Sequence, residues 1–236
     1  MKTLTALIPF FNEERTIGEL VHQLDSLPKD VLYECIFIDD GSTDSSNSIL
    51  GQALLGVSFR YQVILKSNGG KASAIKEGTR ALSTTHAVIL DSDLELATSD
   101  IEKLWNVVLR GECDYIFGYR IFLSHSSFTY RYSRGNQLIS NLYGLLFNEV
   151  ITDIMCGYKL VPTETLQSLN YQYKRFGLEI EIPMKMWLQN QRPFEVEVAY
   201  RARTRAQGKS ISIKDAFVII ASMITFRITH RRRIKW

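Results

Sequence analysis

The chain has 236 residues, of which 45% are hydrophobic and 11% aromatic, and this composition excludes an intrinsically disordered protein. Lys and Arg together number 28 against 25 Asp and Glu, so the net charge of +3 is too small to indicate a nucleic-acid-binding protein. The N-terminal residues do not follow the pattern of a signal peptide, and three widely spaced cysteines favour reduced thiols. We therefore expect a cytoplasmic protein with one domain and no nucleic-acid partner.

Apolar runs alternate with amphipathic stretches of helix length through the first half of the chain. The apolar runs predict strands over 4–9, 33–38, 61–65, 87–90 and 115–118. The amphipathic stretches predict helices over 16–27, 44–55, 71–82 and 99–109, and two later helices near 137–147 and 179–189. This order predicts an α/β fold in which helices flank a mostly parallel, Rossmann-like sheet, in a single domain.

Polar side chains follow three of the predicted strands. They are Asn12 and Glu13 after the first strand, Asp39 and Asp40 after the second, and Asp91 and Asp93 after the fourth. Ligands of open α/β sheets bind beyond the carboxyl ends of the strands, so we expect these side chains to border one crevice.

The segment 91–95 (Asp-Ser-Asp-Leu-Glu) contains a DxD motif just past a strand. Carboxylate oxygens are the ligands that Mg²⁺ and Mn²⁺ prefer, and such an ion neutralises the charge on a departing nucleotide diphosphate. The alternative is a solvated acidic turn, and a motif this short does not by itself decide between the two.

Two turns that contain glycine lie near the same crevice. Residues 39–44 (Asp-Asp-Gly-Ser-Thr-Asp) are typical of a strand end followed by a helix start, and their carboxylates could also bind a base edge or a ribose hydroxyl. Residues 68–73 (Asn-Gly-Gly-Lys-Ala-Ser) leave backbone N–H groups free and place Lys71 near any bound phosphate. Neither a Walker motif nor a GxGxxG motif is present, which argues against an ATPase or a dinucleotide-binding protein.

Four ordered motifs together resemble family 2 glycosyltransferases of the GT-A fold; they lie at 8–14, 39–44, 70–74 and 91–95. Further segments resemble the branch that contains dolichyl-phosphate mannosyltransferases and bacterial polyprenyl-phosphate glycosyltransferases; these lie at 118–120, 133–136, 152–159 and 177–181. The resemblance covers nearly the whole chain. It implies a GT-A domain over 1–210, with a nucleotide-sugar-binding half at 1–118 and an acceptor half at 119–210, followed by an amphipathic, basic segment at 211–236.

The resemblance also implies roles for individual residues. The donor would be bound by Pro9, Phe11, Asn12, Glu13, Asp39, Asp40, Lys71, Ser92, Arg203 and Arg205. The metal would be held by Asp91, Asp93 and Glu95, and the acceptor phosphate by Arg120, Arg131 and Arg134. The residues expected to take part in catalysis are Asp91, Asp93, Asp153, Arg120 and Arg134.

The expected activity is metal-dependent, inverting transfer of a sugar from a UDP- or GDP-linked donor to a polyprenyl (dolichyl or undecaprenyl) phosphate. A phosphate acceptor is already ionised near neutral pH, because its second pKa is about 6, and it needs no general base. One alternative is transfer to a hydroxyl of a glycan or glycolipid in cell-surface polysaccharide synthesis, for which Asp153 is the candidate general base. The other is a nucleotide-sugar-binding module without catalytic activity.

The segment 213–228 is mainly apolar and leads into Arg231, Arg232 and Arg233. This pattern fits an element that lies in a membrane interface and meets anionic lipid, and equally a core-packing helix followed by a solvated basic tail. Its longest apolar run, 216–226, is too short to cross a bilayer, which needs about 20 residues. We expect a peripheral location on the cytoplasmic face of a membrane, with or without a membrane-anchoring partner protein.

Overall fold

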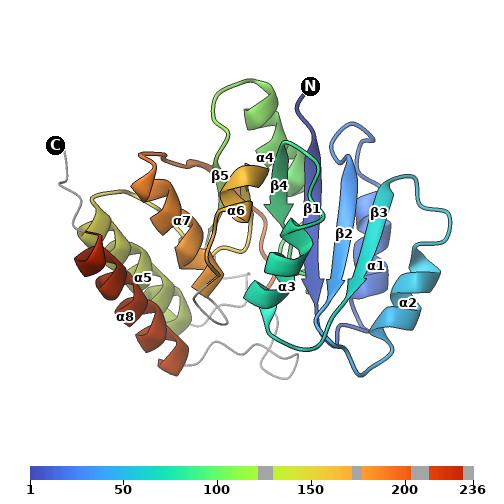
Figure 1. The fold of residues 1–236 in the computed structure, drawn as a ribbon, viewed down its shortest axis with the longest axis horizontal. Helices are drawn as coiled ribbons and strands as arrows, with labels where there is room; N and C mark the ends of the chain where they lie inside the picture. The colour runs from blue at the N-terminus through green and yellow to red at the C-terminus, as the bar shows by residue number, and fades with distance from the viewer. Residues whose placement is uncertain (122–129, 172–176, 203–212, 231–236) are drawn as a thin grey trace.

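A seven-stranded sheet runs through the middle of the computed structural model, which describes residues 1–121, 130–171, 177–202 and 213–230 (Figure 1). The strands are β1 (Leu4–Phe10), β2 (Glu34–Asp39), β3 (Arg60–Leu65), β4 (His86–Ile89), β5 (Ile116–Arg120), β6 (Lys159–Pro162) and β7 (Phe194–Val198). The helices are α1 (Ile17–Asp25), α2 (Ser46–Ala53), α3 (Lys71–Thr79), α4 (Asp100–Leu109), α5 (Tyr130–Phe147), α6 (Thr163–Gln167), α7 (Leu178–Leu188) and α8 (Ile213–Thr229).

The strand order is β3-β2-β1-β4-β6-β5-β7. Strands β1 to β4 are all parallel to their neighbours, with Leu7 of β1 opposite Ile36 of β2 and Ile89 of β4. Strand β6 is antiparallel to both β4 and β5, and β7 is parallel to β5. The predicted mostly parallel sheet flanked by helices is confirmed, and β6, β7 and α6 are additions that the sequence patterns did not indicate.

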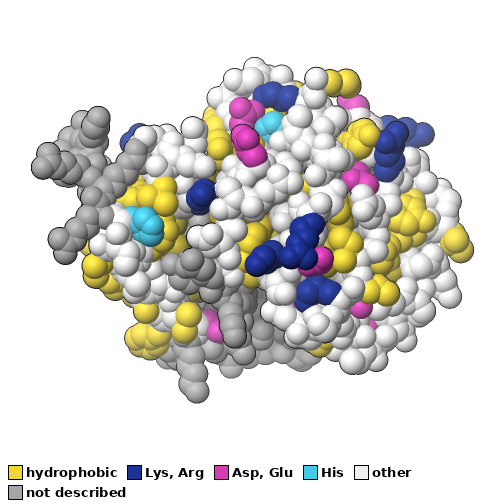
Figure 2. All heavy atoms as spheres, in the orientation of Figure 1, with side chains coloured by type: hydrophobic (Ala, Val, Ile, Leu, Met, Phe, Trp, Pro, Cys, Tyr) yellow, Lys and Arg dark blue, Asp and Glu magenta, His cyan; other side chains and the backbone are white. Residues whose placement is uncertain are grey.

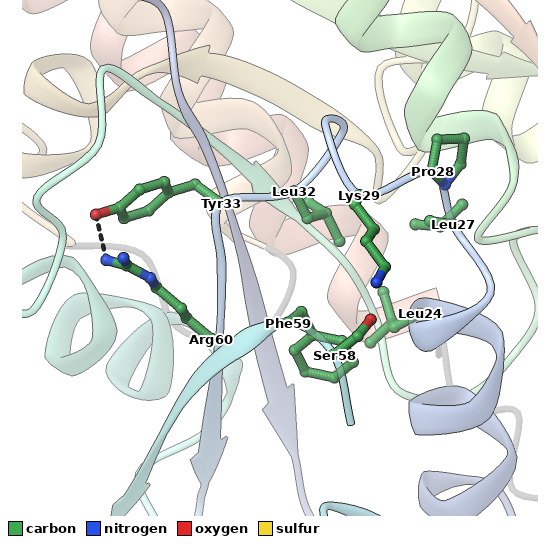
Figure 3. A pocket seen from close by; sticks show the side chains of 9 residues that line it. All are labelled: Leu24, Leu27, Pro28, Lys29, Leu32, Tyr33, Ser58, Phe59 and Arg60. Atoms are coloured by element: carbon green, nitrogen blue, oxygen red, sulfur yellow. Dashed lines mark hydrogen bonds between the residues drawn. The ribbon is translucent and has the colours of Figure 1, made fainter. Parts of the chain in front are cut away.

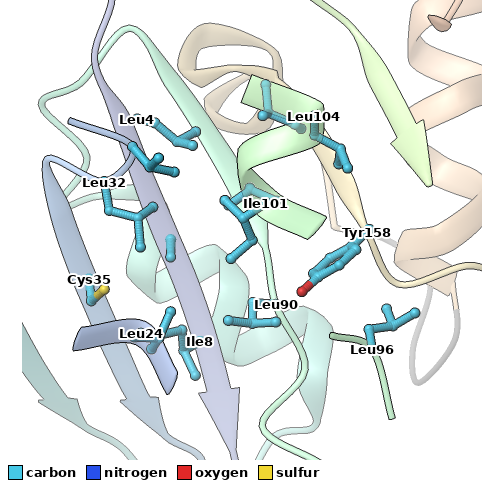
Figure 4. Packing of buried hydrophobic residues seen from close by; sticks show 14 of the residues in the cluster. Leu4, Ile8, Leu24, Leu32, Cys35, Leu90, Leu96, Ile101, Leu104 and Tyr158 are labelled. Atoms are coloured by element: carbon cyan, nitrogen blue, oxygen red, sulfur yellow. The ribbon is translucent and has the colours of Figure 1, made fainter. Parts of the chain in front are cut away.

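Helices cover both faces of the sheet because its central strands β1, β2 and β4 are buried along their whole length. Leu4 and Ile8 of β1 pack toward α1, α2 and α4, and Figure 4 shows Ile101 and Leu104 of α4 in this cluster. The inward positions of α1 are Ile17, Leu20, Val21 and Leu24, which have the spacing of one helical face. On the other face, Leu7 packs with residues of α3, α5, α6, α7 and α8.

The helices α5 and α8 lie side by side on the α7 side of the molecule (Figure 1). The Nε atom of Arg227 in α8 donates to the carbonyl of Leu146 in α5 at 2.8 Å, and the ring of Phe226 lies 6.2 Å from that of Phe147. The two helices therefore run in the same direction and meet at their C-terminal ends. Within the described residues, no helix has the length and apolar content needed to cross a membrane.

Candidate functional site

The turn after β2 is organised by the carboxylate of Asp39. Its Oδ1 accepts from the backbone N–H of Ser42 at 2.8 Å, and its Oδ2 accepts from Nδ2 of Asn47 at 2.7 Å. Gly41 adopts φ +81°, and a Cβ atom there would lie 2.8 Å from the backbone nitrogen of Asn68, so the turn requires glycine. Asp39 thus fixes the chain between the carboxyl end of β2 and the start of α2.

The neighbouring Asp40 holds the loop that leads into α3. Its Oδ1 accepts from Lys66 Nζ at 2.5 Å and from the N–H of Gly69 at 2.9 Å, and its Oδ2 accepts from the N–H of Gly70 at 2.6 Å. Both aspartates are buried, and their oxygens already bind protein groups. Contact between these two residues and a base or ribose stays a prediction.

The ends of β1, β2 and β4 are tied together by short polar contacts. Asn12, at φ +55°, donates its N–H to Ser42 Oγ at 3.0 Å and accepts from the N–H of Thr43 at 2.8 Å. Ser92 Oγ donates to the carbonyl of Pro9 at 3.1 Å. The ends of these three strands therefore lie together, as the topology requires. Of the residues expected to border one crevice, Asn12, Glu13 and Asp93 line the cleft described below.

Two other predicted donor residues occupy different environments at the same edge. Glu13 accepts at Oε2 from Thr16 Oγ1 at 2.9 Å, and its N–H donates to Ser46 Oγ at 2.8 Å. The ring of Phe11 is 45% exposed and is available to a flat ligand such as a base.

Lys71, the first residue of α3, joins the DxD motif to α7. Its Nζ lies 2.6 Å from Asp91 Oδ1 and 2.9 Å from Glu179 Oε1. Burial by itself would lower the pKa of Lys71, but the two carboxylates outweigh burial and raise the pKa above its ordinary value. A Cβ atom on Gly157 would lie 2.5 Å from Asp91 Oδ2, so this glycine makes room for the carboxylate.

Asp93 and Glu95 bind separate partners. Asp93 Oδ1 accepts from the N–H of Glu95 at 3.0 Å, and Leu94 between them has φ +57°. Glu95 Oε2 accepts from the hydroxyl of Tyr200 at 2.5 Å, and burial together with this carboxylate raises the pKa of Tyr200. Residues 199–201 run antiparallel to 95–97, since Arg201 donates its N–H to the carbonyl of Glu95 at 2.8 Å.

A cleft of about 1100 Å³ opens beside Asp93 and Glu95, and carboxylates outnumber cations along it. Its charged lining residues are Glu13, Glu14, Arg15, Glu19, Asp44, Asp93, Glu95 and Arg201. In the part of the chain that the structure describes, no three His, Cys, Asp or Glu residues are grouped closely enough to hold a metal ion. The three predicted metal ligands therefore share one short segment without converging on one point.

Arg120 and Asp153 form a buried ion pair on the acceptor side. Arg120 Nε lies 2.6 Å from Asp153 Oδ2 and Nη2 lies 2.9 Å from Oδ1, which is a bidentate arrangement. Only 7% of Arg120 and 2% of Asp153 is exposed. Burial opposes the charge of Arg120, but Asp153 raises the pKa of the guanidinium well above its ordinary value.

Several groups close over this pair. The guanidinium carbon of Arg120 lies 5.0 Å from the ring centre of Tyr200, and Asn136 Nδ2 in α5 donates to Asp153 Oδ1 at 3.4 Å. Tyr200 thus contacts Glu95 on one side and Arg120 on the other. Neither Tyr200 nor Glu179 was a predicted site residue; Glu179 lies in the segment 177–181 on which the family resemblance rests, whereas no local pattern marks Tyr200.

Of the other predicted arginines, the structure describes the side chain of Arg134 alone. Arg134 is exposed on α5, where Nη1 donates to Gln137 Oε1 at 2.9 Å and the guanidinium carbon lies 5.2 Å from the ring centre of Tyr130. The side chain of Arg131 and the whole of Arg203 and Arg205 lie outside the described residues.

A second, smaller pocket of about 300 Å³ lies at the opposite end of the strands (Figure 3). Leu24, Leu32 and Phe59 line it, and Arg60 closes one side by donating to the hydroxyl of Tyr33 at 2.5 Å. It lies near the beginnings of β2 and β3, and the carboxyl ends of these strands carry the site described above.

The model of the family described as glycosyl transferase family 2 matches residues 5–169. An uncharacterized protein of Methanocaldococcus jannaschii is 26% identical over 184 residues, which cover 71% of this chain and 75% of that protein. The undecaprenyl-phosphate 4-deoxy-4-formamido-L-arabinose transferase of Edwardsiella ictaluri is 26% identical over 211 residues. That alignment covers 87% of this chain but only 62% of the relative's length.

Solved structures of glucosyl-3-phosphoglycerate synthase from Mycobacterium tuberculosis have the same fold. Its complex with uridine diphosphate superposes with a TM-score of 0.75 at 19% identity, covering 96% of this chain and 80% of that one. Its complex with Mn²⁺, UDP-glucose and phosphoglyceric acid gives a TM-score of 0.74 at 20% identity, covering 97% and 79%.

Proposed function

This chain belongs to glycosyl transferase family 2, and on that premise we propose that it moves a sugar from a nucleotide diphosphate to a polyprenyl phosphate, with a divalent metal ion and with inversion. Transfer of a glycosyl group follows from the family. The lipid phosphate acceptor is the specific part of the proposal, and one relative, the undecaprenyl-phosphate transferase, has a name that agrees with it.

The observation that carries the choice of acceptor is the pairing of Asp153. A hydroxyl acceptor needs a general base within hydrogen-bond reach, and Asp153 was the candidate. Both of its oxygens are bound by Arg120, and the residue is almost completely buried. A phosphate acceptor needs no such base, because it is already largely ionised near neutral pH. The geometry around Asp153 therefore favours a phosphate over a hydroxyl.

Arginines on the same side are suited to such an acceptor. The exposed guanidinium of Arg134 on α5 would meet the phosphate first, with Arg131 one turn earlier on the helix. The buried guanidinium of Arg120, held in place by Asp153, would contribute positive charge beneath the acceptor. The phosphate oxygen would then attack the anomeric carbon in line with the departing diphosphate, which is the step that inverts the sugar.

The chemistry of the DxD segment fits a hard divalent cation. Mg²⁺ in nucleotide enzymes is commonly bound by one or two carboxylates together with substrate phosphates, so a site without three converging protein ligands is compatible with it. Asp91 and Asp93 would hold the ion, with Glu95 beside them. When bound, the metal would neutralise the charge of the departing diphosphate. The Mycobacterium tuberculosis synthase was crystallised with Mn²⁺ and with Mg²⁺, which supports this choice.

The donor would lie along the ends of β1, β2 and β4. Pro9 and Phe11 would contact the base, and Ser92 would contact the donor near Asn12 and Glu13. Lys71 would lie near the diphosphate from its position between Asp91 and Glu179. Arg203 and Arg205 would complete the grip on the diphosphate from the chain segment that follows Tyr200.

A panel of UDP and GDP sugars, offered with Mn²⁺ or Mg²⁺ and a short-chain polyprenyl phosphate, tests the proposal directly. We expect a sugar-phosphate-lipid product by mass spectrometry that disappears with a chelator and with Asp93→Asn. Glu19→Gln is the matched control, because Glu19 lines the same cleft and its Oε1 accepts from Gln23 Nε2 at 2.9 Å, within α1. Product on phosphoglyceric acid or on a glycan hydroxyl, with none on the lipid phosphate, would contradict the proposed acceptor.

A further inference from the structure

The outward faces of α5 and α8 carry large apolar side chains that nothing in the described structure covers. The exposed positions of α8 between 217 and 228 are Phe217, Val218, Ala221, Ile224, Thr225 and Ile228, and none of them is charged. On α5, Leu138 is 62% exposed and Leu145 is 80% exposed. Figure 2 shows yellow hydrophobic side chains gathered on the side of the molecule where α8 lies. We call Leu138, Leu145, Phe217, Val218, Ile224 and Ile228 the outer apolar face.

This face is not the result of a loosely attached helix. Ile219 and Met223, on the other side of α8, are almost fully buried against the second core cluster. On α5, Tyr143 is fully buried and its ring stacks on Phe147 at 4.4 Å. Each helix is thus packed along one side; the exposed positions of α8 between 217 and 228 carry no charge, whereas those of α5 combine Leu138 and Leu145 with polar residues such as Asn141. Single exposed apolar residues are ordinary, but a continuous group of them marks an interaction surface.

The charge around the face indicates which partner it fits. The acidic residue at the start of α8, Asp215, is buried, and the exposed positions named above include no carboxylate. The sequence continues directly from α8 into Arg231, Arg232 and Arg233. An apolar helix face next to clustered basic residues is the pattern of an element that lies in the interface of an anionic membrane.

From these observations we propose that the outer apolar face docks on an anionic lipid bilayer, with α5 and α8 lying along the interface. A 17-residue helix is about 25 Å long, which gives the contact a length comparable to that of other interfacial helices. The basic residues after α8 would add electrostatic attraction to the lipid headgroups.

The position of α5 connects this surface to the site. The opposite side of α5 carries Asn136, which donates to Asp153, and Ser140 Oγ, which accepts from the N–H of Ile154 at 3.1 Å. One helix therefore borders the Arg120 and Asp153 pair on one side and the outer apolar face on the other. This docking gives the proposed lipid phosphate acceptor a short route to the site, and that consequence rests on the proposed function.

Flotation with vesicles of phosphatidylglycerol and phosphatidylcholine tests the docking, with vesicles of phosphatidylcholine alone as the comparison. We expect the protein to float with the anionic vesicles and to be released at high salt. The double variant Phe217→Glu/Ile224→Glu should bind about tenfold more weakly, since it places charge where apolar side chains would enter the interface. Leu55→Glu is the matched control, because Leu55 is 81% exposed and lies after α2 on a different part of the surface.

Thermal unfolding of each variant shows whether it is folded, and light scattering gives its oligomeric state. Equal flotation of the double variant and the native chain, or no flotation of the native chain with anionic vesicles, would overturn the proposal. A dimer that the double variant abolishes would instead assign the face to a second copy. An activity assay with a water-dispersed short-chain polyprenyl phosphate, without vesicles, separates the docking proposal from the proposed acceptor. Activity in this assay without flotation would refute the docking alone. Flotation without activity in this assay would refute the acceptor alone.

Discussion

Replacing Asp153 by Asn should cost much of the protein's stability, because it leaves a buried guanidinium without its counter-charge. Removing one partner of a buried ion pair typically costs about 3–5 kcal/mol. Arg120 and Asp153 qualify, since the two side chains are almost fully buried and joined by bonds of 2.6 and 2.9 Å. A chain of 236 residues has an unfolding entropy of roughly 0.5 kcal/mol/K at its midpoint, so the expected fall in Tm is about 6–10 °C.

Calorimetry without donor or metal measures this change. The double variant Arg120→Met/Asp153→Leu serves as the control, because removing both charges should be less costly than removing one. Kinetics then separate two roles. If Asp153 only positions Arg120, Asp153→Asn should mainly raise the KM for the acceptor, and the pH profile of kcat should keep its shape. A fall of less than about 2 °C together with loss of the acidic limb of that profile would refute the reasoning and make Asp153 a general base.

Three further predictions concern two groups beside the DxD segment and one half-buried carboxyl, Glu149, just after α5. Gly157→Ala would push a methyl group against Asp91, so we expect at least about a tenfold loss of activity in metal titrations. Gly51→Ala, in open space on α2, should retain activity. Equal activities of the two variants would contradict this interpretation. Glu179→Gln leaves Lys71 with Asp91 as its one carboxylate partner, so Lys71 should bind Asp91 more strongly and compete with the metal. The Mn²⁺ concentration for half-maximal activity should therefore rise several-fold, and an unchanged metal titration would contradict this. Burial raises the pKa of Glu149 to about 7, so the contribution of this carboxyl to the free energy of unfolding should be greatest below pH 4.5 and should fall by about 1 kcal/mol as the pH rises to 7, after allowance for partial exposure. In urea titrations Glu149→Gln should remove that fall, and a variant with the native pH dependence would rule the assignment out.

The elements that the sequence predicted well are those whose packing is periodic. α1 has one apolar face, and β1 and β2 are buried along their whole length, so their spacing alone identifies them. β6 was missed because it is four residues long and includes Lys159, a fully buried lysine whose Nζ donates to the carbonyls of Ile154 and Cys156. β7 was missed because it has only five residues, follows Pro193 and has glutamates, Glu195 and Glu197, at every second position.

The candidate site could likewise be predicted only in part. Residues that follow strands, such as Asp40 and Asp91, could be located because topology brings strand ends together. Their partners could not be located, because the pairs depend on contacts between distant parts of the chain. Lys71 meets Glu179 across 108 positions, and Tyr200 meets Glu95 across 105. No periodicity or local motif contains that information.

The three contacts of Asp40 have a consequence for the interpretation of inactive variants. This carboxylate fastens Lys66, Gly69 and Gly70 just before the helix that begins with Lys71. An allele that replaces Lys66 would loosen this loop and shift Lys71 away from the DxD segment without altering any residue proposed to bind the donor. Such an allele would have the phenotype of a donor-binding lesion, although its defect would be one of loop anchoring.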